Sequence, residues 1–143
     1  MALLGSILKR AVNLGGKIPK KTNFDVQQRK VLKKLLSKAQ HTAFGEHFNF
    51  TKLLQEKNPI DAFQETVSMY DYNSIYKQWW VRAHKGEPYV CWPGHIKYFA
   101  LSSGTSDSAS KYIPVTKDLL NAFKKGSVRQ LIAQRHYDLP AEK

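Results

Sequence analysis

One polar segment decides how the fold of this chain is interpreted: Ser102-Ser103-Gly104-Thr105-Ser106-Asp107-Ser108-Ala109-Ser110-Lys111. Apolar residues flank it on both sides, with Phe99-Ala100-Leu101 before it and Tyr112-Ile113 and Val115 after it. Short aromatic and β-branched runs around a Ser/Gly-rich stretch are typical of a β-hairpin. The pattern predicts two short strands joined by a polar bend, in a chain whose other apolar residues recur at helical spacing. The expected fold class is α+β, with N-terminal helices packed around the hairpin.

The composition of this bend suits a polyphosphate. A tight loop can offer consecutive backbone N–H groups and several hydroxyls to phosphate oxygens, while Lys111 adds a compact positive charge. The bend is not a Walker loop, because Ser110 stands where that motif requires glycine, and it is not a dinucleotide fingerprint, because Gly104 stands alone. Composition by itself leaves a second reading open, a polar hairpin turn that binds no ligand.

A family resemblance favours the phosphate site. Leu101-Ser102-Ser103-Gly104-Thr105-Ser106, followed by Lys111 and Pro114, resembles the phosphate-binding motif of the acyl-acid amido synthetases of the auxin-responsive promoter family. These enzymes belong to the adenylate-forming superfamily. Further matching positions lie upstream: Thr42, Phe44, Gly45 and Phe48, then Phe63-Gln64-Glu65-Thr66-Val67, then Tyr72 and Gly86-Glu87. The similarity extends from about Gln28 to Thr116.

The resemblance implies a ligase. ATP and a carboxylic acid would form an acyl-adenylate and pyrophosphate, and an amine or amino acid would then attack to give an amide. By the same resemblance, the ATP phosphates would be held by Ser102, Ser103, Gly104, Thr105, Ser106 and Lys111, with Mg²⁺ sharing the charge. The catalytic residues stay unknown. One departure is that Asp107 and Ser108 stand where family members usually carry turn glycines, and Asp107 adds a negative charge near the expected phosphates.

The length of 143 residues suggests only part of such an enzyme. Adenylate-forming enzymes are several times longer, so we expect residues 1–143 to be the N-terminal part of an adenylate-forming domain, truncated and inactive alone. The C-terminal part of the same protein would then be its main partner and would supply the adenine, ribose and lid residues. An exposed sheet edge on the hairpin is the expected consequence.

The chain is strongly basic, with 23 Lys and Arg against 11 Asp and Glu and a formal net charge of +12. We favour solvated helix faces as the cause, because four lysines fall on the polar side of one predicted helix: Lys30, Lys33, Lys34 and Lys38. No nucleic acid is therefore expected as a partner. The rival is a small basic RNA-binding module in which Lys111, Trp79, Trp80 and Tyr98 supply charge and stacking. A non-catalytic remnant that packs against a partner is a third reading.

The remaining chemistry-bearing residues predict little. Cys91 is the single cysteine, so no internal disulfide is possible, and it is interpreted as a small packed residue in a cytoplasmic protein. The five histidines show no metal-binding spacing, so no metal site is expected on the protein. An amphipathic basic stretch from Leu3 to Val12 predicts a first helix that docks on the rest of the protein, without stable membrane insertion. A mitochondrial-type presequence and a membrane-surface helix are the less favoured alternatives.

Apolar spacing predicts the other helices. One runs from Asp25 to Ala39 with Asn23 or Asp25 as its cap, and short helices follow at 51–55 and after Asn58-Pro59. Residues 67–70 should be extended. A helix capped near Asp71 should place the aromatics of 72–80 in the core and end at Gly86, and a last helix should follow Thr116 and loosen at Gly126-Ser127.

Overall fold

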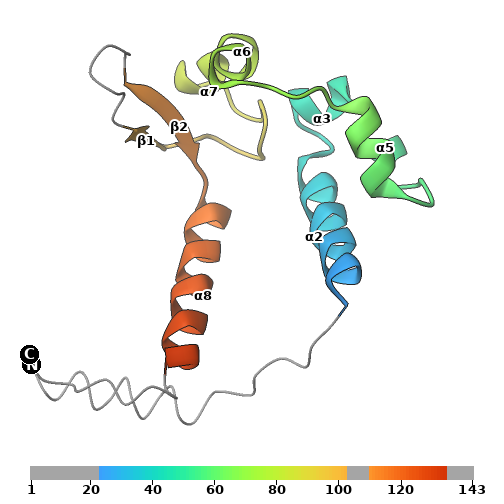
Figure 1. The fold of residues 1–143 in the computed structure, drawn as a ribbon. Coiled ribbons are helices and arrows are strands. Elements are labelled where there is room, and N and C mark those ends of the chain that lie inside the picture. Colours follow the sequence, from blue (N-terminus) through green and yellow to red (C-terminus); the bar gives the residue numbers. More distant parts are fainter. Residues whose placement is uncertain (1–22, 103–109, 135–143) are drawn as a thin grey trace, which may run out of the picture. The chain divides into compact units, whose positions relative to one another are not determined.

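The computed structural model of the chain describes residues 23–102 and 110–134. The helix expected between Leu3 and Val12 and positions 103–109 of the bend lie outside the described residues. Residues 22–116 form one compact unit, whereas the last helix, α8, belongs to a second one. Helices and a two-stranded sheet confirm the α+β class (Figure 1).

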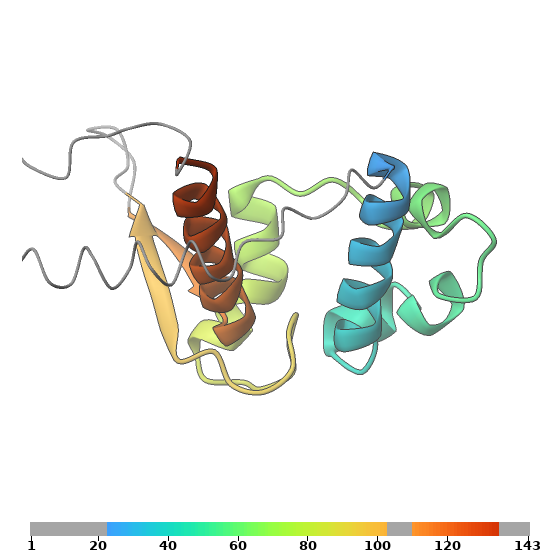
Figure 2. The same ribbon diagram turned by 90° about the horizontal axis from the view of Figure 1, so that it is seen from below.

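The first described helix, α2, spans Phe24–Ala39 (Figure 2). Asn23 caps it by accepting a hydrogen bond of 3.0 Å from the Asp25 N–H. Leu36 and Ala39 are buried, and the four predicted surface lysines are exposed, which confirms the polar face. The apolar stripe of α2 extends beyond its buried face: Val31 belongs to the stripe but remains 57% exposed.

Two short helices follow, α3 at Ala43–His47 and α4 at Phe50–Leu53. Thr42, which has no exposed surface, joins α3 to the end of α2: its hydroxyl donates to the Ala39 carbonyl (2.7 Å) and accepts from the Gly45 N–H (3.1 Å). Asn49 begins α4 in the left-handed region, at a φ of 51°, and accepts from the Lys52 N–H. The short helix predicted at 51–55 is therefore present, but it begins one residue earlier and ends two residues earlier than predicted.

Helix α5 spans Pro59–Thr66, with proline at its start as predicted. The predicted role of Asn58 as the cap of α5 is wrong, because its side chain makes no capping hydrogen bond to the helix. It instead accepts from the Arg29 guanidinium at 3.1 Å and donates to Asp61. After α5 the chain leaves the helix at Val67, whose backbone is extended as predicted.

The predicted aromatic helix is present but is not one regular α-helix. It consists of α6 (Tyr72–Ile75), the π-helical segment η1 (Tyr76–Trp80) and α7 (Val81–His84). Asp71 caps it by accepting from the Ser74 N–H at 2.7 Å, and the hydrogen bonds from Ser74 lower the pKa of the Asp71 carboxyl. Gly86, at a φ of 91°, follows the end of α7.

The burial of the aromatics corrects the prediction that all of them lie in the core. The stripe divides between two surroundings. Trp79 is 7% exposed and belongs to the core, whereas Tyr72 and Tyr76 are half-buried and stack on each other with ring centroids 5.6 Å apart.

The core of the 22–116 unit is rich in aromatic rings. Phe44 lies among them, with ring centroids 4.8 Å from Phe48, 5.9 Å from Phe50 and 5.1 Å from Trp79. Tilted and edge-on ring contacts of this kind stabilise a core beyond the area they bury. The buried hydrophobic residues are Leu36, Ala39, Phe48, Phe50, Leu53, Trp79, Ala83 and Val90.

The hairpin has the predicted strands. β1 spans Tyr98–Ser102 and β2 spans Lys111–Val115, and they pair antiparallel with Tyr98 opposite Val115 and Ser102 opposite Lys111. Within the described part of the chain these two strands form the whole sheet, so both strands have an outer edge.

Helix α8 spans Lys117–Gln134 and follows Thr116 directly, as predicted. The loosening expected at Gly126-Ser127 is absent, because the helix continues through both residues. The Ser127 hydroxyl donates to the Phe123 carbonyl at 3.1 Å, so the side chain is satisfied within the helix rather than competing with it.

Candidate functional site

The candidate site lies at the end of the hairpin where the bend begins and ends. Ser102 and Lys111 are register partners on adjacent strands, so the structure brings these two predicted site residues together. Ser102 is half-buried and Lys111 is exposed. The other four predicted site residues lie outside the described residues: Ser103, Gly104, Thr105 and Ser106, as do Asp107 and Ser108 of the bend.

The Lys111 ammonium has an aromatic neighbour. Its Nζ lies 5.3 Å from the centre of the Tyr72 ring of α6, within the range of a cation–π contact. In the described part of the chain, Lys111 forms no ion pair with a carboxylate, whereas Arg82 is paired with Glu87. Among the described residues, the Lys111 ammonium therefore lies beside a ring and forms no ion pair, an environment that suits the attraction of an anion.

A group of rings joins the helices α6 and α7 to both strands; we call it the aromatic cluster. Its members are Tyr72, Tyr76, His84, Phe99 and Tyr112. The Tyr72 hydroxyl accepts from the Tyr112 N–H at 2.8 Å, and the Tyr76 hydroxyl shares a hydrogen bond of 2.7 Å with His84 Nδ1. The His84 ring lies 4.8 Å from Phe99 and 4.6 Å from Tyr112, between centroids. The hairpin is therefore held from one side by these rings.

The contact between Tyr72 and Tyr112 was missed by the sequence reasoning. The two residues are 40 positions apart, and a helical stripe of aromatics indicates burial without indicating which element it meets. The only available signal was that Tyr72 and Lys111 both belong to segments that resemble the same family.

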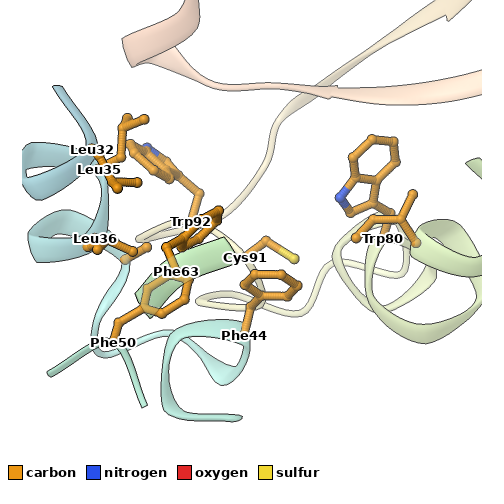
Figure 3. Close-up of a pocket in the computed structure, with 11 residues that line it drawn as sticks. Leu32, Leu35, Leu36, Phe44, Phe50, Phe63, Trp80, Cys91 and Trp92 are labelled. Atoms are coloured by element: carbon orange, nitrogen blue, oxygen red, sulfur yellow. The ribbon is translucent and has the colours of Figure 1, made fainter. Parts of the chain in front are cut away.

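An apolar pocket of about 250 Å³ lies elsewhere in the same unit (Figure 3). Leu32, Leu35 and Leu36 contribute from α2, and Figure 3 shows Phe63, Cys91 and Trp92 grouped near them, with Trp80 on the opposite side. The side chains that line it carry no charge, so this pocket does not suit a phosphate.

Cys91 is a packed residue, as predicted. Burial raises the pKa of its thiol to about 12, which leaves the unreactive protonated form at neutral pH. Among the described residues, no three or more His, Cys, Asp or Glu side chains are grouped so that they could hold a metal ion. The part of the chain that the structure describes therefore offers neither an activated thiol nor a metal site.

The raised pKa of Cys91 predicts a loss of stability in alkali. Between the ordinary thiol value of 9.0 and about 12, the unfolded chain loses the thiol proton while the folded chain keeps it. The free energy of unfolding should therefore fall as the pH rises above 9.0, by about 1 kcal/mol near pH 10. Urea unfolding of the wild type and Cys91→Ala at neutral pH and at alkaline pH measures this. The variant should lose less stability than the wild type, and equal losses would contradict the assigned burial.

Comparison with known protein families shows to which family the chain belongs. The GH3 family N-terminal domain matches residues 19–142. The chain belongs to the GH3 family. This is the auxin-responsive family of acyl-acid amido synthetases, so the predicted relationship is confirmed. No curated protein and no solved structure matches this GH3 chain.

Two further properties bear on ligands of the GH3 chain. None of the helices that the structure describes is both long enough and apolar enough to cross a membrane. Among the described residues, no group of three or more acidic, histidine or cysteine side chains could by itself enclose a Mg²⁺ ion. Magnesium that arrives already bound to ATP needs few protein ligands, because phosphates and water complete its shell.

Proposed function

We propose that this GH3 chain contributes the ATP phosphate-binding segment of an enzyme that activates a carboxylic acid and joins it to an amine or amino acid. The observation that carries the proposal is the pairing of Ser102 with Lys111 at the loop end of the hairpin, on either side of the serine-rich bend. Membership of the GH3 family supports the reaction class.

The reaction class explains why a phosphate grip is needed. A carboxylate is a poor acyl donor because its negative charge resists nucleophiles. An oxygen of the carboxylate attacks the α-phosphorus of ATP, the bond to the bridging oxygen breaks, and pyrophosphate leaves. The amine nitrogen then attacks the carbonyl carbon of the acyl-adenylate, AMP leaves with the electron pair of the broken C–O bond, and the nitrogen loses a proton to give the neutral amide. Both the bound triphosphate and the departing pyrophosphate carry charge that fixed donors can stabilise.

In this proposal each site residue has a role. The hydroxyls of Ser102, Ser103, Thr105 and Ser106 and the N–H groups of the bend donate to phosphate oxygens. Gly104 allows close approach of the backbone to the ligand. Lys111 contributes the positive charge that opposes the developing charge of pyrophosphate.

The same proposal treats residues 1–143 as the N-terminal part of an adenylate-forming domain that is inactive alone. The residues that hold adenine and ribose, and a mobile lid, would come from the C-terminal part of the same protein.

The rival RNA-binding reading is weakened by the core. Of its three stacking residues, Trp79 is 7% exposed and its indole N–H donates to the Tyr70 hydroxyl at 3.3 Å, whereas Tyr98 is 66% exposed. The Trp79 ring already contacts Phe44 and His47, so it offers no face to a base.

Titration of the chain with MgATP, with AMP and with single-stranded RNA tests the proposal. MgATP should bind saturably, and AMP should bind far more weakly because it lacks the β- and γ-phosphates. Each titration is repeated at about 50 mM and about 200 mM salt, since binding of a nucleic-acid backbone weakens steeply over this interval. Steeply salt-dependent RNA binding without any response to ATP would overturn the proposal and favour the basic module.

A further inference from the structure

We infer that Tyr72 is the positioning residue for the loop end of the hairpin: its hydroxyl fixes the outer edge of β2, and its ring fixes the Lys111 ammonium. The consequence for ATP rests on the proposed function. Neither the family resemblance nor the predicted motif assigns Tyr72 a role.

The first step of the inference concerns the outer edge of β2. Backbone N–H groups alternate between the two edges of a strand, so residues 112 and 114 face the same edge. The Tyr112 N–H points away from β1, because its partner is the Tyr72 hydroxyl at 2.8 Å. Residue 114 is proline and has no N–H to offer. Within β2, the outward amide at Tyr112 is therefore the one that a neighbouring element can hold, and Tyr72 holds it next to Lys111.

The second step concerns the Tyr72 ring, which is itself fixed. It stacks on Tyr76 at 5.6 Å, lies edge-on to Trp80 at 6.3 Å, and stands in the first turn of a helix capped by Asp71. The Lys111 Nζ lies 5.3 Å from the centre of this ring. A flexible lysine side chain that is already restricted loses less entropy when an anion binds.

Both contacts of Tyr72 therefore act on the start of β2, at Lys111 and Tyr112. The hydroxyl restrains the backbone of the residue after Lys111, while the ring restrains the end of the Lys111 side chain. Together they set where the ammonium stands relative to Ser102, its register partner across the hairpin. This is a positioning role, because Tyr72 acts on an anion through Lys111.

Two substitutions separate the contributions of hydroxyl and ring. Tyr72→Phe removes the acceptor for the Tyr112 N–H and keeps the ring under Lys111. Tyr72→Leu removes both. Tyr98→Phe is the matched control, because Tyr98 is an exposed tyrosine at the opposite end of the same hairpin, paired with Val115.

The test combines hydrogen exchange at the Tyr112 amide, measured by NMR, with the dissociation constant for MgATP. In Tyr72→Phe the Tyr112 amide should exchange about tenfold faster or more, since it has lost its acceptor. The dissociation constant should rise about threefold to tenfold, as expected for one lost neutral hydrogen bond. Tyr72→Leu should weaken ATP binding further, and Tyr98→Phe should change neither quantity.

The outcomes separate this inference from the proposed function. An unchanged Tyr112 exchange rate in Tyr72→Phe overturns the inference, and so does unchanged ATP affinity in both Tyr72 variants. A wild-type chain that binds no ATP contradicts the proposed function, whereas the exchange rate still decides whether Tyr72 holds β2.

Discussion

Replacing Lys111 with alanine is expected to weaken MgATP binding by about tenfold to hundredfold, the range for one lost hydrogen bond to a charged group. The reason is local: in the described part of the chain the Lys111 ammonium has a ring beside it and no carboxylate, at the loop end of the hairpin. Calorimetric titration of both chains with MgATP measures the change. In the complete protein, exchange of pyrophosphate into ATP should slow by a similar factor.

Lys97→Ala is the matched control for this prediction. Lys97 is exposed and lies immediately before β1, at the end of the hairpin away from the bend. Its substitution therefore removes one positive charge far from the proposed phosphate site. The net charge falls from +12 by one unit in either variant. Equal weakening by the two substitutions would contradict a specific role for Lys111 and would indicate general attraction between a basic chain and an anion.

Gly45→Ala is expected to destabilise the 22–116 unit by about 3 kcal/mol or more, enough to leave a marginal unit largely unfolded. A Cβ atom at this position would stand 2.0 Å from the Ala39 carbonyl oxygen and 2.8 Å from the Ala39 carbonyl carbon. Both are backbone atoms at the end of α2, so no side-chain rotation relieves the clash. Separating α3 from α2 would also break the hydrogen bond from the buried Thr42 hydroxyl to the Ala39 carbonyl. Urea unfolding followed by tryptophan fluorescence reports the loss.

Gly126→Ala provides the contrasting substitution. Gly126 lies inside α8, and a Cβ atom there meets nothing within 4 Å. Alanine favours helix over glycine by about 1 kcal/mol, so this change should stabilise α8 without affecting the 22–116 unit. A Gly45→Ala chain that unfolds at the wild-type urea concentration would show that α2 and α3 do not approach as closely as the structure has them.

Most of the secondary structure could be predicted because local rules determine it. Apolar spacing and Asn23 predicted α2, the Ser/Gly-rich segment between two apolar runs predicted the hairpin, and Asp71 predicted the start of the aromatic helix. Each of these depends on residues a few positions apart, which pattern reasoning can compare directly.

The remaining features depend on contacts between distant residues. Nothing in the helical spacing of Tyr76 to Trp80 indicates that this segment forms a π-helical turn. Asn58 fitted the rules for a cap, but its side chain instead met Arg29, 29 positions away. The Tyr72 hydroxyl likewise accepts a hydrogen bond from the backbone of Tyr112, 40 positions away. The pairing of Ser102 with Lys111 was therefore predictable from the hairpin pattern, whereas the contact of Tyr72 with the same hairpin was not.

One titration decides most directly whether the loop end of the hairpin holds the phosphates of ATP. Amide signals of the isotope-labelled chain are followed by NMR while MgATP, and separately inorganic tripolyphosphate, is added to millimolar concentration. Both ligands should shift the amides of Ser102, Lys111 and Tyr112 together, with one dissociation constant for each ligand, and leave those of Lys30 and Lys33 on α2 unchanged. Unmoved hairpin amides, or shifts confined to the lysine face of α2, would contradict the proposed phosphate site.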